Sequence, residues 1–389
     1  MNESSFRSAS GRVRERSVIH REPDGTIRVT LGADAVRIEP DARGEHDRQR
    51  ADFAAWLLLP VAMRRGVDLV IEGAGSEATV RNAGRLAQIW SQWLPGHFTA
   101  VDVSFTQTWT EAPASNAGDL CFYSGGVDST YGILRRFRAG HQQSLLTVHG
   151  LEYRHGDSGR FADLLEKTAP FANLVAFRRL LVRTDVKDLY RRERVDPKGI
   201  DVAHGFILAA MGFLYSNMFG RAVLSADYKL DQQFAVHPWG TNAITNPLFS
   251  DGTFSLHTEG EDVTRTEKCG LLLESPEALA SLTFCVDYSA RPHNCGRCQK
   301  CVRTKAMFLA ATGGIPPICR DMSLAPDCLA SFDLSLKSQR AFFVDLHASA
   351  AKSGRLDEIP GLRALHAQHF PRDPRRSLTK RIKRFLRGK

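Results

Sequence analysis

One segment of this chain combines residue types and a spacing that suit phosphate chemistry: Ser124-Gly125-Gly126-Val127-Asp128-Ser129. It follows the apolar residues 120–123 and precedes a helical pattern, which predicts a turn between a strand and a helix. Two glycines let the main chain adopt conformations closed to other residues. The first N–H groups of a helix lack partners inside the helix and attract anions. With hydroxyl donors on Ser124, Ser129 and Thr130, the turn is predicted to hold a polyphosphate.

Asp128 lies inside this segment but is a poor phosphate ligand, because a carboxylate repels an anion. We therefore interpret Asp128 as a ligand for Mg²⁺, which prefers oxygen donors. The segment is not a Walker loop, since no G-x-x-x-x-G-K-[ST] occurs in the chain. The alternative is an ordinary Gly-Gly turn at the end of a strand.

A second group of residues suits metal binding. Cys295, Cys298 and Cys301 form a C-x2-C-x2-C pattern, and Cys285 precedes them by ten residues. Four thiolates at this spacing are typical of a tetrahedral zinc site, and the absence of an open position favours a structural role. An iron–sulfur cluster is the alternative. His293 is a reserve ligand, and the four other cysteines are not assigned to a site: Cys121, Cys269, Cys319 and Cys328.

Length and charge narrow the class of protein. With 389 residues the chain is long enough for two domains. No run approaches the roughly 20 apolar residues of a membrane span, and segment 1–16 is polar without a signal-peptide core, so we expect a cytoplasmic protein.

The positive charge of the chain is concentrated near its C-terminal end. Residues 371–389 hold nine Lys or Arg against one Asp, so this tail carries +8 of the net charge of +9. This tail has a basic amphipathic pattern that suits RNA or an anionic membrane, or it is a solvated end.

The elements before the turn predict an N-terminal α/β domain over 17–110. Strands are expected at 26–31, 35–38, 69–72 and 99–106, with helices at 50–63 and 78–93. Residues 111–118 are rich in small residues and proline, as in a linker. A C-terminal helical region is expected over 316–370.

Residues 119–315 alternate strands with helices. Such repeats predict right-handed crossovers and a parallel sheet, with ligands bound at the carboxyl ends of its strands. Two carboxylates follow predicted strands, Asp185 after 174–182 and Asp227 after 222–225. Asp227 is the stronger candidate for a role in substrate or magnesium binding, while a cap or turn is the alternative for both.

The turn in its strand–turn–helix context resembles the SGGxDS signature of the PP-loop ATP pyrophosphatase family. This resemblance implies an adenine nucleotide alpha hydrolase-like (Rossmann-like) sheet, with ATP pyrophosphate on residues 124–130 and cleavage between the α and β phosphates. It assigns adenine recognition to the main chain at Val148 and His149. It also implies a cation near the ATP phosphates, for which Arg265 and Lys268 are the candidates; a salt-bridged helix start is the alternative.

Together, the turn and the cysteines resemble the 7-cyano-7-deazaguanine synthase family over about residues 119–309. The resemblance implies ATP, Mg²⁺ and Zn²⁺, with a small carboxylate substrate and an amine or ammonia donor. The expected chemistry is adenylation of the carboxylate, followed by amide or nitrile formation. The chain departs from that family in the Cys285–Cys295 spacing and after Asp227, which favours a divergent member with another substrate. A tRNA-thiolating enzyme and a non-catalytic nucleotide-binding protein remain alternatives, and a homodimer is left open.

Overall fold

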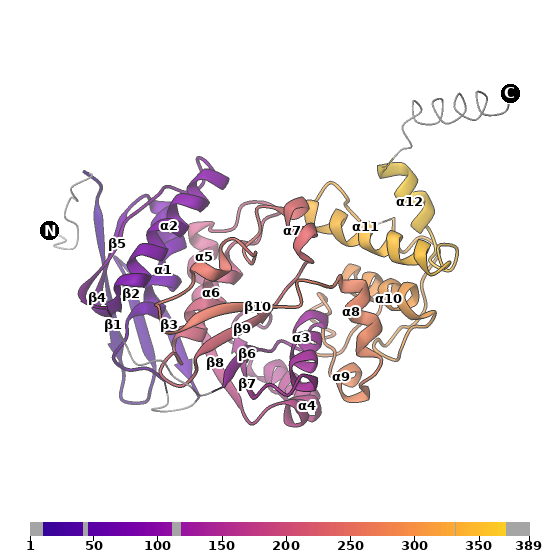
Figure 1. Ribbon diagram of the computed structural model, residues 1–389, viewed down its shortest axis with the longest axis horizontal. Helices are drawn as coiled ribbons and strands as arrows, with labels where there is room; N and C mark the ends of the chain where they lie inside the picture. The colour runs from indigo at the N-terminus through magenta and orange to yellow at the C-terminus, as the bar shows by residue number, and fades with distance from the viewer. Residues whose placement is uncertain (1–10, 42–45, 111–117, 331, 371–389) are drawn as a thin grey trace. The chain divides into compact units, whose positions relative to one another are not determined.

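The structure is a computed structural model that describes residues 11–41, 46–110, 118–330 and 332–370 (Figure 1). The chain divides into two compact units, Met1–Val263 with Ser275–Thr283, and Thr264–Glu274 with Phe284–Lys389. The basic tail 371–389 and most of the predicted linker, 111–117, lie outside the described residues. Within the described ranges, no helix has the length and apolar character needed to cross a bilayer.

The first unit contains a mixed sheet of ten strands. In spatial order the strands are β10 (Ser255–Glu259), β9 (Arg221–Ser225), β6 (Asp119–Phe122), β7 (Gln143–His149), β8 (Arg179–Thr184), β3 (Asp34–Pro40), β2 (Ile27–Leu31), β1 (Arg14–Arg21), β4 (Asp68–Ser76) and β5 (Val103–Trp109). This arrangement confirms the α/β class and is compatible with a Rossmann-like fold.

The strands from β10 to β8 are all parallel to their neighbours. Helices α3 (Val127–Arg138) and α4 (Ser158–Val175) carry the chain outward from β6 to β8, and α5 (Val186–Glu193) and α6 (Ala203–Phe213) carry it back to β9. Crossovers between parallel strands are right-handed. Because the chain moves across the sheet in one direction through α3 and α4 and in the opposite direction through α5 and α6, these two pairs of helices lie on opposite faces of the sheet. The order reverses between β6 and β9, where ligands of open α/β sheets bind.

The N-terminal strands continue the same sheet. Strand β3 pairs antiparallel with β8, with Ile38 opposite Thr184, and β2, β1, β4 and β5 follow it. The sheet therefore runs without a break across the predicted boundary between the N-terminal α/β domain and the PP-loop domain. The strands on both sides of that boundary belong to the first unit. Pairing with β3 also covers the edge of β8 that a separate parallel sheet would leave open.

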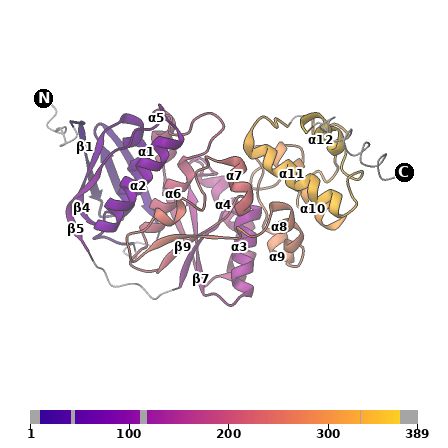
Figure 2. The same cartoon turned by 45° about the horizontal axis from the view of Figure 1, so that its top comes forward.

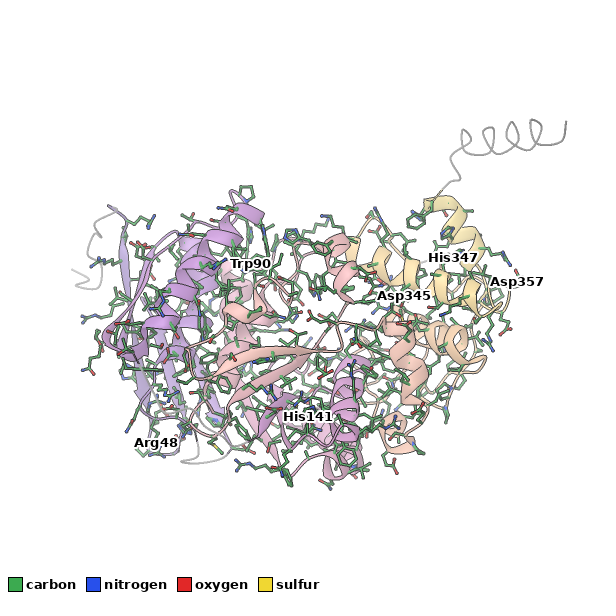
Figure 3. The ribbon with its side chains drawn as sticks, viewed as in Figure 1. Arg48, Trp90, His141, Asp345, His347 and Asp357 are labelled. Carbon is green, nitrogen blue, oxygen red and sulfur yellow. The ribbon has the colours of Figure 1, made fainter. Side chains whose placement is uncertain are left out.

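Helices α1 (Asp52–Arg65) and α2 (Glu77–Trp93) pack on this N-terminal part (Figure 2). Helix α1 is buried almost all round because it contacts α2, α6 and β4 at once. Its Trp56 meets Phe213 and Phe249 edge to face at 5.6 and 5.4 Å. Trp90 of α2 (Figure 3) is fully buried and packs against Phe206 of α6. This shared core fixes the start of α6, which carries part of the candidate site.

The second unit contains helices joined by the cysteine segment and by irregular stretches, such as the described part of 313–336. Its helices are α8 (Arg265–Leu272), α10 (Gln299–Thr312), α11 (Lys337–Lys352) and α12 (Leu362–His369). Asp345 of α11, labelled in Figure 3, accepts hydrogen bonds from the N–H and hydroxyl of Thr266 at 3.1 and 2.6 Å. Helices α11 and α12 both lie within 316–370, where a helical region is expected.

Candidate functional site

The predicted phosphate-binding turn lies between β6 and α3. Gly126 is the N-cap of α3 in an extended conformation, with φ −72° and ψ 165°, and no side chain caps the helix. The N–H groups in the first turn of α3 therefore have no capping side chain as a hydrogen-bond acceptor. Asp128 lies in this first turn and is half-buried. A helix start of this kind is suited to an anionic ligand.

Gly125 gives the turn its shape. Its φ is +75°, a conformation that L side chains rarely adopt. A Cβ atom at this position would lie 2.4 Å from Cγ2 of Thr283 and 3.1 Å from Cγ2 of Thr168. The N–H of Thr283 also donates to the Gly125 carbonyl at 2.8 Å. Glycine is therefore required here on two independent grounds, conformation and space.

Hydroxyl groups hold the turn in place. The Oγ atoms of Ser124 and Ser129 lie 3.2 Å apart, and Ser129 Oγ donates to the Gly126 carbonyl at 3.2 Å. Ser124 is exposed, so its hydroxyl can also reach a ligand. Thr130 is fully buried, which places it behind the turn and separates it from the two serines.

Arg179 supplies a positive charge behind the turn that sequence reasoning missed. Its Nε donates to Thr147 Oγ1 at 2.9 Å and its Nη1 to Thr168 Oγ1 at 2.8 Å. The guanidinium lies 5.2 Å from the centre of the Tyr123 ring. Burial lowers the pKa of Arg179 to about 10, so the group is still charged at neutral pH. Its position in a strand otherwise rich in apolar residues gave no signal in the sequence.

The two residues predicted to recognise adenine, Val148 and His149, lie at the end of β7. Leu146 accepts a hydrogen bond from the Tyr123 N–H, so its backbone faces β6. Backbone groups in a strand point to alternate neighbours, and Val148 therefore faces the same side, beyond the end of β6 at Phe122. The backbone of His149 points toward β8 instead. Main-chain recognition of a base is thus better suited to Val148 than to His149.

The His149 side chain is part of the packing. Its ring stacks on Phe161 with 4.1 Å between centres, and its Nε2 lies 2.8 Å from the Arg154 carbonyl. Burial lowers the pKa of His149, which favours the neutral ring. This ring is oriented by local contacts.

Asp227 follows β9 and lies in a polar cluster at the carboxyl edge of the sheet. Its Oδ2 accepts from Trp239 Nε1 at 3.0 Å and from Thr241 Oγ1 at 3.2 Å. The same oxygen lies 3.6 Å from Nε2 of His204, the second residue of α6, while His204 Nδ1 lies 3.0 Å from Asp201 Oδ1. Sequence reasoning found Asp227 but missed His204, because a histidine at the start of an apolar helix has no distinctive pattern.

The two carboxylates control the charge of His204. Burial by itself would lower the pKa of His204, but Asp201 and Asp227 outweigh burial and raise it well above its usual range. His204 is therefore an imidazolium at neutral pH, held between two anions.

We expect replacement of His204 by Gln to lower the free energy of unfolding more at about pH 6 than at about pH 10. The charged ring stabilises the fold fully below its unfolded pKa of about 6.5, and this contribution is lost as pH rises through the raised folded pKa. Urea titrations of the two proteins at each pH test this, with exposed His141→Gln as the control. An equal difference at both pH values would contradict it.

Arg265 and Lys268 belong to the second unit, whereas the turn belongs to the first. They begin α8, which Thr264 and Glu267 cap reciprocally. The Arg265 guanidinium lies 4.2 Å from the centre of the Phe342 ring, and Lys268 is fully buried. Both side chains are therefore engaged in the packing of their own unit, and their predicted contact with ATP phosphates remains a prediction.

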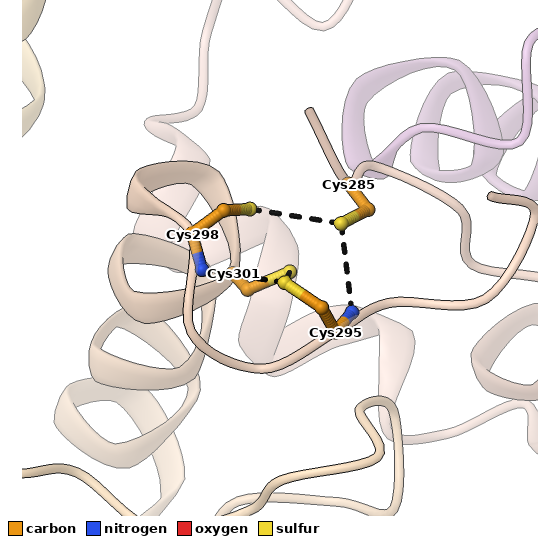
Figure 4. A group of neighbouring side chains, drawn as sticks. All are labelled: Cys285, Cys295, Cys298 and Cys301. Atoms are coloured by element: carbon orange, nitrogen blue, oxygen red, sulfur yellow. Dashed lines mark hydrogen bonds between the residues drawn. The ribbon is translucent and has the colours of Figure 1, made fainter. Parts of the chain in front are cut away.

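The four predicted metal ligands converge in the second unit (Figure 4). All four sulfur atoms lie within 4.8 Å of one another. Sγ of Cys285 is 3.7 Å from that of Cys298, and Sγ of Cys295 is 3.9 Å from that of Cys301. Sulfurs placed tetrahedrally about 2.3 Å from a zinc ion would be about 3.8 Å apart. This group can hold a metal ion.

Backbone donors support the cysteine group. The N–H groups of Arg297 and Cys298 donate to Cys295 Sγ at 3.4 and 3.3 Å, as expected for a tight turn around metal-bound sulfur. A hydrogen bond from Cys301 lowers the pKa of Cys298, which favours the thiolate form. The reserve ligand His293 is not among the four, whereas Cys319, which sequence reasoning left unassigned, packs against them.

Compared with known proteins, the chain matches no family model, no curated protein and no solved structure.

Proposed function

We propose that this protein is an ATP-dependent adenylating enzyme that activates a substrate carboxylate and releases pyrophosphate. One observation carries the proposal: the Ser124–Ser129 turn leads into a helix with no side-chain cap and contains a glycine with a φ of +75° whose Cβ position is blocked by Thr283. This arrangement suits a polyphosphate bound by main-chain N–H groups. The resemblance to PP-loop enzymes adds the site of cleavage, between the α and β phosphates.

In the proposed reaction, a carboxylate oxygen of the substrate attacks the α-phosphorus of ATP. The bond between that phosphorus and the α,β-bridging oxygen breaks, and its electron pair leaves with pyrophosphate, giving an acyl-adenylate. An amine or ammonia then attacks the acyl carbon and displaces AMP to form an amide, losing a proton to solvent. A second activation, of the amide oxygen, would lead to a nitrile.

The chain's own residues supply alignment and charge in this proposal. The first-turn N–H groups of α3 and the Ser124 hydroxyl hold the β and γ phosphates, while Arg179 provides a fixed positive charge behind them. The Val148 main chain orients the adenine. Asp227, held by Trp239 and Thr241, orients the acceptor from the end of β9.

Two metals belong to the proposal. Asp128 would hold Mg²⁺, which offsets the negative charge of the phosphates. Cys285, Cys295, Cys298 and Cys301 would hold Zn²⁺ in a structural role, because four thiolates leave no open coordination position.

The magnesium assignment can be tested by ATP binding. We expect Asp128→Asn to weaken Mg²⁺ affinity of the ATP complex about 10- to 100-fold, while ATP binding in EDTA changes little. Calorimetric titrations with and without Mg²⁺ measure both quantities. Asp163→Asn, on the exposed side of α4, is the matched control. A variant that keeps the Mg²⁺ dependence of the wild type would refute the role of Asp128.

A further inference from the structure

A basic cavity lies in the first unit, apart from the turn. Its volume is about 660 Å³, within the roughly 300–1,000 Å³ of small-molecule sites. Five Lys or Arg residues line it, with a single acidic residue, Asp196. The cationic residues are Arg64, Lys187, Arg191, Arg194 and Lys198.

Few of these charges are neutralised by the protein. Arg191 pairs with Asp188 at 2.7 Å. Arg64 and Lys187 donate to main-chain carbonyls, Glu193 at 3.1 Å and Leu151 at 2.9 Å respectively, so both cations are held in place by the backbone. Lys187 also interacts electrostatically with Asp201. Within the described residues, Arg194 and Lys198 make no ion pair, and both are exposed.

The acidic residue of the cavity does not balance these cations. Oδ1 of Asp196 accepts the N–H groups of Val202 and Ala203, both at 2.7 Å. These bonds tie the carboxylate to the start of α6. With five cations against this one carboxylate, the cavity keeps an excess of positive charge, and two of the cations are oriented by backbone contacts.

We infer that this cavity binds the phosphate group of a small phosphorylated molecule. A phosphomonoester carries between one and two negative charges near neutral pH and several acceptor oxygens. Arg and Lys donors recognise such a group by charge-assisted hydrogen bonds. The volume of about 660 Å³ suits a molecule of nucleotide size, which favours a small ligand over a nucleic-acid backbone.

The position of the cavity suggests which molecule this is. Ala203 lines the cavity, and the next residue, His204, faces Asp227 at the end of β9. Lys187 contacts Leu151, which follows β7. The cavity therefore borders the carboxyl edge of the sheet, and we assign it to the acceptor, whose anionic end would be held there. This assignment to the acceptor rests on the proposed function.

The test uses ribose 5-phosphate as the probe, with ribose, citrate and a short RNA duplex as comparisons. We expect saturable calorimetric binding of ribose 5-phosphate only, and protection of Lys198 from acetylation while exposed Lys352 still reacts. Arg194→Gln with Lys198→Gln should weaken binding at least about tenfold. The control, Arg81→Gln with Arg85→Gln, removes the same charge from the exposed face of α2 and should bind as the wild type does.

Absence of saturable binding, an equal loss in both double variants, or preference for citrate or RNA would each overturn the inference. The experiments distinguish failure of the phosphate-site inference from failure of the proposed adenylation. Lys198 protection by ribose 5-phosphate, together with ADP and inorganic phosphate as the main products when ATP is incubated with small carboxylates, would leave a phosphate site and refute the adenylation. Release of AMP and pyrophosphate without protection would refute the site alone.

Discussion

Replacing Gly125 by alanine is expected to weaken Mg·ATP binding about 10²-fold or more. The added Cβ would meet Cγ2 of Thr283 at 2.4 Å, and the residue would also have to keep a φ of +75°. The turn must therefore move, and its donors no longer meet the phosphates together. Loss of two hydrogen bonds to charged oxygens, at about 1.5–3 kcal/mol each, accounts for a change of this size. Calorimetric titration with ATP measures it directly.

Two further variants separate the steric effect from backbone strain. Gly140 has a φ of +78° with no atom near its Cβ position, so Gly140→Ala imposes only the conformational cost of about 1–2 kcal/mol on folding and should bind ATP normally. Thr283→Ser removes the methyl group that the added Cβ would meet, and should restore part of the affinity when combined with Gly125→Ala. Normal ATP binding by Gly125→Ala alone would contradict the phosphate-binding role of the turn.

Cys298→Ser is expected to lose the zinc ion proposed for the cysteine group and to destabilise the second unit by about 3 kcal/mol or more. A structural metal contributes its binding free energy to folding, and Cys298 is one of four converging ligands. Metal analysis should find about one zinc per chain in the wild type and much less in the variant. The melting temperature should fall accordingly.

Cys328→Ser is the matched control, because Cys328 is a partly buried cysteine of the same unit outside the metal group. It should retain zinc and a melting temperature close to that of the wild type. Iron with sulfide in the purified protein, or a Cys298→Ser variant as stable as the control, would refute the structural zinc site.

The parts of this molecule that sequence reasoning predicted are those with a strong local pattern. The glycine turn between β6 and α3 and the four cysteines occupy the predicted elements, because each depends on residues close in sequence. Helices α1 and α2 and strands β2 to β5 also lie where periodicity places them. Strand β1 was missed, since half of the residues in Arg14–Arg21 are charged and only Ser17 is buried.

The rest depends on contacts between residues far apart in sequence. The joining of both parts into one sheet follows from the β3–β8 pairing, which no local pattern specifies. Helix α6 ends at Phe213 although the apolar sequence continues to Phe219, because the chain turns within the core after Phe213. Likewise, Asp227 reaches His204, and Arg179 reaches the back of the turn, only through tertiary packing, although Asp201, the other partner of His204, is close in sequence.

The central claim is that ATP is cleaved between its α and β phosphates. The direct measurement is product analysis after incubating the full chain with Mg·ATP and a panel of small carboxylates, phosphorylated ones included, with ammonia present. We expect AMP and pyrophosphate in equal amounts, formed only with a competent acceptor and not by the Gly125→Ala variant. Release of ADP and inorganic phosphate as the main products would contradict the account.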